Sequence, residues 1–238
     1  MIVKSNKIKT KIKIAAALTL CLVFLFGLCS CSDVIKVKSN DNGFDDPKNG
    51  IGYTLCSRAV FALKVGKVWA KDQNGNEYCE IPFENPEVFL CDNDPELPFV
   101  YRAESQPDVT INNFYPIAAF LYLEGEKSLY VDHFVAEKKY LNESAAARDD
   151  VQDDSPYTYA IRDAMTLGDP VRDTPPVQAE METDYTVHIR LLSAEFPGLY
   201  YEIVFWRDLN GLNYLYDRGS MLSYLCPYIV TYRLWEDS

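Results

Sequence analysis

Histidine is nearly absent from this chain, and so are the short motifs that mark common catalytic sites. Two histidines among 238 residues leave no material for a multi-histidine metal centre. The chain contains no G-x-S-x-G, no P-loop and no G-x-G-x-x-G, so serine hydrolase chemistry and nucleotide binding lack a signature. No C-x-x-C occurs and no cysteine has a histidine nearby, which argues against structural zinc. We therefore predict neither a metal nor another cofactor, and we assign no catalytic residue.

The N-terminus carries the most specific pattern in the chain. Five lysines between Lys4 and Lys13 precede an apolar run over residues 14–28, and Leu28-Cys29-Ser30-Cys31 follows. A positively charged start, an apolar centre and a small residue just before the cleavage site are typical of a secretory signal peptide. The alternatives are an ordinary signal peptide or a transmembrane anchor, because residues 14–31 are just long enough to span a bilayer.

With a cysteine directly after the predicted cut, residues 1–31 resemble the signal peptide and lipobox of bacterial lipoproteins. Cys31 fits the lipid-attachment position better than Cys29, because a small residue, Ser30, precedes it and Leu28 lies three positions before it. The resemblance implies a removed signal peptide over residues 1–30 and a lipid (palmitate) anchor on Cys31. It also implies a location at the cell membrane or outer membrane, on the extracytoplasmic face, with the membrane as a partner through the lipid.

Basic residues are scarce beyond this segment. Five of the 23 Lys and Arg lie within residues 1–30, which leaves 18 against 35 acidic residues. Phosphate backbones repel such a domain, so we predict no nucleic-acid partner. We interpret the acidity as a means of keeping the domain soluble and apart from the membrane surface. The alternative is that the acidic residues bind a cation or a basic partner.

The mature chain is predicted to be mainly β, or β-rich α+β, with antiparallel sheets in a sandwich-like domain. Polar turn-forming residues predict a flexible tether over residues 31–50, followed by a single β-rich extracytoplasmic domain over residues 51–238. Asn74-Gly75 indicates a hairpin. Further short strands are expected at residues 61–65, 87–91, 99–103, 109–112, 117–123 and 128–135.

An acidic insert at residues 141–184 interrupts the strand pattern. Within it, Ser155 as a cap, Pro156 in the first turn and Gly168 at the end predict one docked helix near 156–167. We expect loops on either side of this helix.

The C-terminal part alternates apolar and polar residues and predicts a four-stranded antiparallel meander. Keeping the apolar residues together places Val187 opposite Ile203, and Phe205 opposite Tyr214. Residues 228–235 are expected to finish the sheet as a strand after Pro227.

The same register places His188 opposite Glu202, a combination that can work as an acid–base pair. Cross-strand charge pairs are also ordinary sheet chemistry, and no motif supplies a nucleophile. Asp132 and His133 are neighbours in a strand and point to opposite faces, so they cannot share a metal ligand.

Acidic turns offer weak candidates for calcium. Residues 72–77 and 92–96 hold several oxygen ligands, but the EF-hand order fails. Turn chemistry is the favoured interpretation of both.

Four cysteines remain in the mature domain besides Cys31. An even count outside the cytoplasm allows two disulfides in three pairings, and buried free thiols are the alternative. The four are Cys56, Cys79, Cys91 and Cys226.

Aromatic residues are the remaining clue to function. Four of them fall on the less apolar face of the predicted meander, where flat rings can stack on a carbohydrate or fill a protein partner's pocket. A second core is the competing interpretation. These candidate ligand-binding residues are Trp206, Trp235, Tyr200 and Tyr224.

The sequence thus predicts a membrane-anchored lipoprotein with a non-catalytic binding or envelope-associated role. The alternative is a cell-envelope hydrolase that uses carboxylates or the His188–Glu202 pair. A third option is a subunit of a larger envelope assembly.

Overall fold

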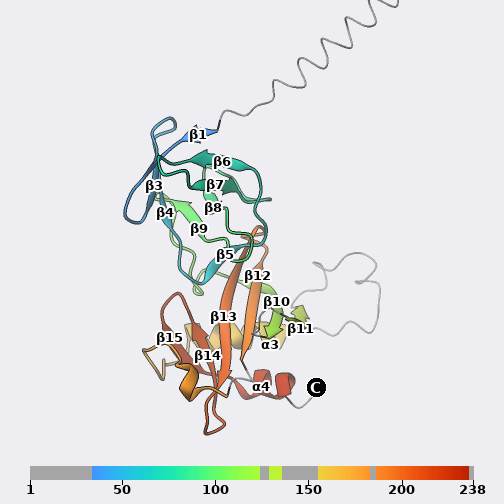
Figure 1. The fold of residues 1–238 in the computed structure, drawn as a ribbon. Coiled ribbons are helices and arrows are strands. Elements are labelled where there is room, and N and C mark those ends of the chain that lie inside the picture. Colours follow the sequence, from blue (N-terminus) through green and yellow to red (C-terminus); the bar gives the residue numbers. More distant parts are fainter. Residues whose placement is uncertain (1–33, 124–128, 136–154, 183–185, 236–238) are drawn as a thin grey trace, which may run out of the picture. The chain divides into compact units, whose positions relative to one another are not determined.

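The computed structural model describes residues 34–123, 129–135, 155–182 and 186–235, and residues 35–238 form one compact unit. Within these ranges the fold is mainly β, with two sheets and two α-helices, which confirms the predicted class (Figure 1). Cys31 and residues 141–154 and 183–184 of the predicted acidic insert lie outside the described residues. Within those residues, no helix has both the length and the apolar character needed to cross a bilayer.

The N-terminal sheet has eight strands and nearly closes on itself. Its order is β1-β6-β7-β8-β9-β4-β3-β2, and only Val37 separates its two outermost strands along the chain. The rings of Phe44, Tyr53 and Tyr78 stack inside it, with centroids 4.8 Å and 3.7 Å from Phe44. The strands are β1 (Ile35–Lys36), β2 (Lys38–Ser39), β3 (Gly43–Asp46), β4 (Ile51–Leu55), β6 (Val68–Lys71), β7 (Glu77–Glu80), β8 (Phe89–Asp92) and β9 (Val100–Ala103).

This sheet corrects the predicted tether over residues 31–50. Residues 35–46 contain β1, β2 and β3 and belong to the sheet. Ile35, Val37 and Phe44 are buried in its interior. Three apolar residues among many polar ones are too few to predict strands from the sequence. These residues become buried because the nearly closed sheet surrounds them.

The C-terminal sheet has seven strands and is antiparallel throughout. Its order is β11-β10-β12-β13-β14-β15. The same edge of β13 pairs with β5 at Leu199–Tyr201 and with β14 from Ile203 onward. The predicted four-stranded meander, β12 to β15, is confirmed. The strands are β5 (Val60–Ala62), β10 (Pro116–Leu123), β11 (Leu129–Val135), β12 (Val187–Ser193), β13 (Leu199–Arg207), β14 (Asn213–Asp217) and β15 (Leu222–Leu225).

The predicted register within the meander is wrong at two places. Val187 lies opposite Phe205 rather than Ile203, a shift of two residues that leaves every side chain on its predicted face. Phe205 lies opposite Leu215 rather than Tyr214, a shift of one residue that exchanges the two faces of β14. Leu215 therefore enters the core, and Tyr214 lies on the face of Trp206.

The helices pack against this sheet. The predicted docked helix is present as α3 (Ser155–Thr166), which contacts β10 and β11 and buries Ile161 and Met165. The predicted final strand is instead α4 (Tyr228–Trp235), which begins after Pro227. A short 3-10 helix, η2 (Gln178–Glu180), lies in the segment that follows α3. The strand expected at residues 109–112 is a loop.

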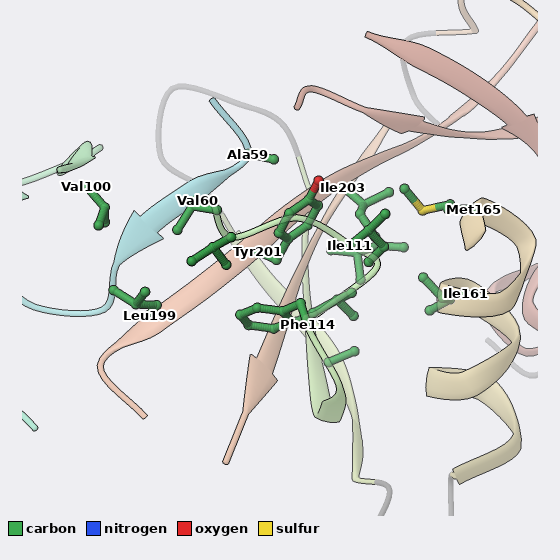
Figure 2. Close-up of a cluster of buried hydrophobic side chains, with 14 of the residues drawn as sticks. Ala59, Val60, Val100, Ile111, Phe114, Ile161, Met165, Leu199, Tyr201 and Ile203 are labelled. Atoms are coloured by element: carbon green, nitrogen blue, oxygen red, sulfur yellow. The ribbon is translucent and has the colours of Figure 1, made fainter. Parts of the chain in front are cut away.

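The main core joins β5, β9, β13 and α3. Figure 2 shows Ile161 and Met165 of α3 directed toward Ile111 and Ile203, with Tyr201 beside them. β5 links the two sheets, because it pairs with β13 and its Phe61 forms a bridge with Phe99 just before β9. Both faces of β13 are buried from Leu199 to Trp206.

Candidate functional site

The four predicted binding aromatics do not form one surface. Tyr200 and Trp206 share the outer face of β13, where they are 3% and 2% exposed. Tyr224 is on the opposite face, in the main core, because of the one-residue register shift. Trp235 ends α4 and is not part of the sheet. The competing interpretation, a second core, therefore describes much of this face.

Residues 169–182, which we call the cover segment, lie across the outer face of the meander. Arg172 and Ser223 form a bridge through their backbones, as do Met181 and Asp208. Met181 also packs on the small cluster that contains Trp206. This contact explains why Trp206 is buried although no further β-sheet covers it.

A pocket of about 570 Å³ lies between the cover segment and the end of β13. Trp206 and Tyr214 stack in it, with ring centroids 4.5 Å apart and planes inclined by 20°. The Arg172 guanidinium lies 5.7 Å from the centre of the Trp206 ring system. We call this the Trp206 pocket, and its volume is that of a small-molecule site.

Polar groups surround these rings. Arg172 forms an ion pair with Glu180 at 2.6 Å. Asp208 accepts backbone hydrogen bonds from Asn210 and Leu212, each at 2.9 Å, and the Tyr214 hydroxyl lies 3.3 Å from its other oxygen. Although desolvation alone raises the pKa of Asp208, these hydrogen bonds hold it below its ordinary value, so the carboxylate is charged at neutral pH.

Trp206 also has a buried polar atom without a partner. Its indole Nε1 has no hydrogen-bond acceptor among the described residues. A buried donor that lacks an acceptor costs about 1–3 kcal/mol, so such groups call for an explanation. A ligand oxygen or an ordered water in the pocket would supply the acceptor.

Most members of this pocket were missed by sequence reasoning. Trp206 was predicted, but Tyr214 was assigned to the wrong face, and nothing local singles out Arg172 or Glu180. The turn-forming residues Asp208-Leu209-Asn210-Gly211, two positions after Trp206, are the one sequence signal that could have placed polar groups beside this ring.

The predicted His188–Glu202 pair is present, although the register is not the predicted one. His188 lies opposite Val204, diagonally from Glu202, and its Nδ1 is 3.3 Å from the Glu202 carboxylate. Arg218 donates a hydrogen bond of 2.7 Å to Glu202, and Arg190 lies 3.5 Å from it. Desolvation raises the pKa of Glu202, but the hydrogen bond from His188 and the charges of both arginines outweigh it and lower the pKa.

This arrangement is that of a charge cluster. Glu202 is 1% exposed and its two oxygens are shared by Arg190, Arg218 and His188. A carboxylate so stabilised in its charged form is a poor proton acceptor. No serine or cysteine side chain contacts the pair among the interactions of the described residues.

The four cysteines in the described ranges offer no reactive thiol. All four are free thiols, and Cys79 faces Cys91 across β7 and β8. Burial raises the pKa of Cys79 to about 11 and those of Cys91 and Cys226 to about 12. Neutral thiols are weak nucleophiles, so these residues fit packing rather than catalysis.

The two acidic turns lie beside each other but serve the backbone. Asp72 accepts hydrogen bonds from the backbone N–H groups of Asn74 and Asn76 in the β6–β7 hairpin. Asp94 accepts from Glu96 and Leu97 in the second turn. Across the described ranges, no group of three or more His, Cys, Asp or Glu side chains is arranged to hold a metal ion. For Asp132 and His133 the backbone register places them opposite Leu121 and Phe120, on alternate faces of β11.

Comparisons with known proteins leave the site to be interpreted from its own geometry. No protein-family model matches the chain, and no curated protein or solved structure shows significant similarity to it.

Proposed function

We propose that this chain is a bacterial lipoprotein that binds a carbohydrate in the Trp206 pocket without transforming it. Lipid on Cys31 would hold it at the cell membrane or outer membrane, with the domain on the extracytoplasmic face. The single observation that carries the binding role is a pocket of ligand size built on a stacked Trp206–Tyr214 pair and bordered by charged groups.

The chemistry of the pocket favours a sugar over an apolar ligand. Sugars present C–H faces to aromatic rings and hydroxyl groups to carboxylates, amides and guanidinium groups. The pocket has both kinds of partner, because Asp208 and Glu180 accept hydrogen bonds while Arg172 donates them. Specific small-molecule sites usually combine aromatic side chains with a small number of polar groups that point toward the ligand.

Tyr214 is the better residue for a test than Trp206. Trp206 is almost fully buried, so Trp206→Ala would leave a cavity and destabilise the domain by about 3–5 kcal/mol. Tyr214 is half-buried and lines the same pocket. We expect Tyr214→Ala to weaken binding at least tenfold while the domain stays folded.

The experiment is a panel of neutral and acidic oligosaccharides screened against the purified domain, with affinities measured by titration calorimetry. Arg172→Gln should also weaken any sugar that binds, whereas Tyr228→Ala, which removes an exposed tyrosine on α4 outside the pocket, should not. Binding that is unchanged in Tyr214→Ala and Arg172→Gln would reject the pocket. A folded domain that binds no sugar in the panel would reject the carbohydrate.

The hydrolase remains a second candidate because His188 and Glu202 do meet. Its test is turnover of chromogenic ester and glycoside substrates by the wild-type domain and by His188→Ala. Activity that disappears in the variant would support the hydrolase. Activity that is unchanged in His188→Ala would remove this pair from any mechanism.

A further inference from the structure

A second pocket, of about 520 Å³, combines aromatic walls with two arginines. Its members come from β4, β5, β9, β14, the loops beside them and Pro175 of the cover segment. Four further lining residues are apolar, and no acidic residue of the described ranges lines it. We call it the arginine pocket, and its aromatic and basic members are Phe61, Phe99, Tyr101, Tyr216, Arg58 and Arg218.

The walls of the arginine pocket are held by ring contacts. Phe61 lies 5.3 Å from Phe99 and 5.3 Å from Tyr200, measured between ring centroids. Phe61 is also fixed by the backbone, since it pairs with Tyr200 in β13 and bridges to Phe99. A pocket wall tied to two sheets in this way is preorganised for an apolar body.

The charge of the pocket contrasts with that of the chain. Acidic residues outnumber basic ones by 35 to 23 in the whole sequence, yet this pocket presents two guanidinium groups and no carboxylate. Arg218 is hydrogen-bonded to the buried Glu202, which Arg190 and His188 share. The Glu202 charge is therefore divided among several cations, and Arg58 is exposed at the pocket without an ion pair to any residue in the described ranges.

The rim carries an uncommon backbone conformation. Met221 lines the pocket with a φ of 61°, a left-handed value that non-glycine residues rarely adopt. Such conformations cost about 1–3 kcal/mol and cluster at ligand clamps and other functional positions. Met221 is 46% exposed, so its flexible side chain is available to a ligand.

We propose that the arginine pocket binds a small organic anion that joins an apolar or aromatic body to one carboxylate, sulfonate or phosphate head. The body packs between Phe61, Phe99 and Tyr216, and the head lies against Arg58 and Arg218. Guanidinium groups bind such heads through paired hydrogen bonds. The site shares no lining residue with the Trp206 pocket, so the two proposals stand or fall separately.

A matched pair of fluorescent probes tests this inference on the folded domain. Anilinonaphthalene sulfonate and phenylnaphthylamine have nearly the same aromatic body, and only the first carries an anion. We expect the sulfonate to bind at least tenfold more tightly. Equal affinity for the two probes would overturn the proposal, because the arginines would then contribute nothing.

Variants locate the binding. Arg58→Gln should weaken the sulfonate about tenfold and leave phenylnaphthylamine unchanged, and Arg218→Gln should act in the same direction. Lys48→Gln, which removes an exposed positive charge between β3 and β4 outside both pockets, is the control and should change neither probe. Because Arg58 is exposed, its variant keeps the fold, which circular dichroism verifies. Sulfonate binding that survives in Arg58→Gln would reject the site.

Competition experiments show which kind of anionic head group the pocket prefers. Naphthoate and naphthyl phosphate displace the sulfonate if the pocket accepts both heads, and the tighter of the two identifies the preferred class. Failure of both to displace the probe would overturn the proposal.

Discussion

Glu202 is a buried carboxylate that contacts Arg190, Arg218 and His188 at once. Its charge is stabilised by the hydrogen bond from His188 and by the nearby arginines, and this stabilisation exceeds the cost of burial. At the scale of single residues, this balance keeps Arg190 and Arg218 near each other on the outer face of the meander without mutual repulsion.

We expect Glu202→Gln to lower the free energy of unfolding by about 3 kcal/mol at pH 7, because Arg190 and Arg218 would then lack their counter-charge. The folded-state pKa lies below the ordinary value of 4.5, so the stabilisation is complete above that value and is lost as the pH falls through the folded-state pKa. The difference between variant and wild type should therefore shrink in acid.

Urea unfolding at several pH values measures this dependence. Glu195→Gln, which changes an exposed glutamate just after β12, is the matched control and should cost less than about 0.5 kcal/mol. A pH-independent difference for Glu202→Gln would contradict the electrostatic explanation.

At the scale of elements, Pro227 begins a helix where alternation suggested a strand. Tyr228, Val230, Tyr232 and Leu234 alternate along the chain, which favours a half-buried strand. The observed burial follows the helical period instead, because Val230 is fully buried while Tyr228 and Tyr232 are exposed. Pro227 suits a helix start and its carbonyl accepts from Val230 and Thr231.

The helical conformation of residues 228–235 can be tested by shortening single side chains. Val230→Ala should destabilise the domain by about 1–2 kcal/mol, because it removes buried methyl groups from the core. Tyr232→Ala should cost under about 0.5 kcal/mol, although a strand would bury both side chains alike. Thermal unfolding of the two variants distinguishes the cases, and equal losses would contradict the helix.

At the scale of the whole molecule, the proposed anchor requires one particular cysteine. Cys31→Ser should abolish lipid attachment and release the domain from membranes, whereas Cys29→Ser should leave both intact. Each buried CH₂ of an acyl chain contributes about 0.8 kcal/mol, so a cysteine with several chains holds a domain at a bilayer.

Membrane fractionation and mass spectrometry of the native N-terminus provide the measurement. A mature product that starts at residue 31 with a lipid mass is the expected result. A native product that still starts at Met1, or a Cys31→Ser variant that still carries lipid, would contradict the assignment.

Local patterns in the sequence predicted a large part of the secondary structure. The hairpin at Asn74-Gly75, the strands of the meander and the helix at residues 155–166 follow from turn residues, two-residue alternation and capping signals, which act over a few neighbours. The same local rules failed for residues 35–46, where three buried apolar side chains are spread among polar residues and leave little pattern.

The candidate sites could not be predicted in the same way. Tyr214 joins Trp206 only because β14 pairs with β13 one residue away from the register that the apolar pattern favoured. Likewise, Arg58 and Arg218 are 160 positions apart and meet only through the pairing of β5 with β13.

The sequence by itself determined the N-terminal signal pattern, the acidic charge and the β-rich class, because each depends on composition or on near neighbours. Tertiary structure alone decided the closure of the first sheet, the exchange of faces in β14 and the assembly of both pockets. The physical reason is that strand register is set by packing between distant segments, and a shift of one residue costs little in local propensity while moving every side chain to the other face.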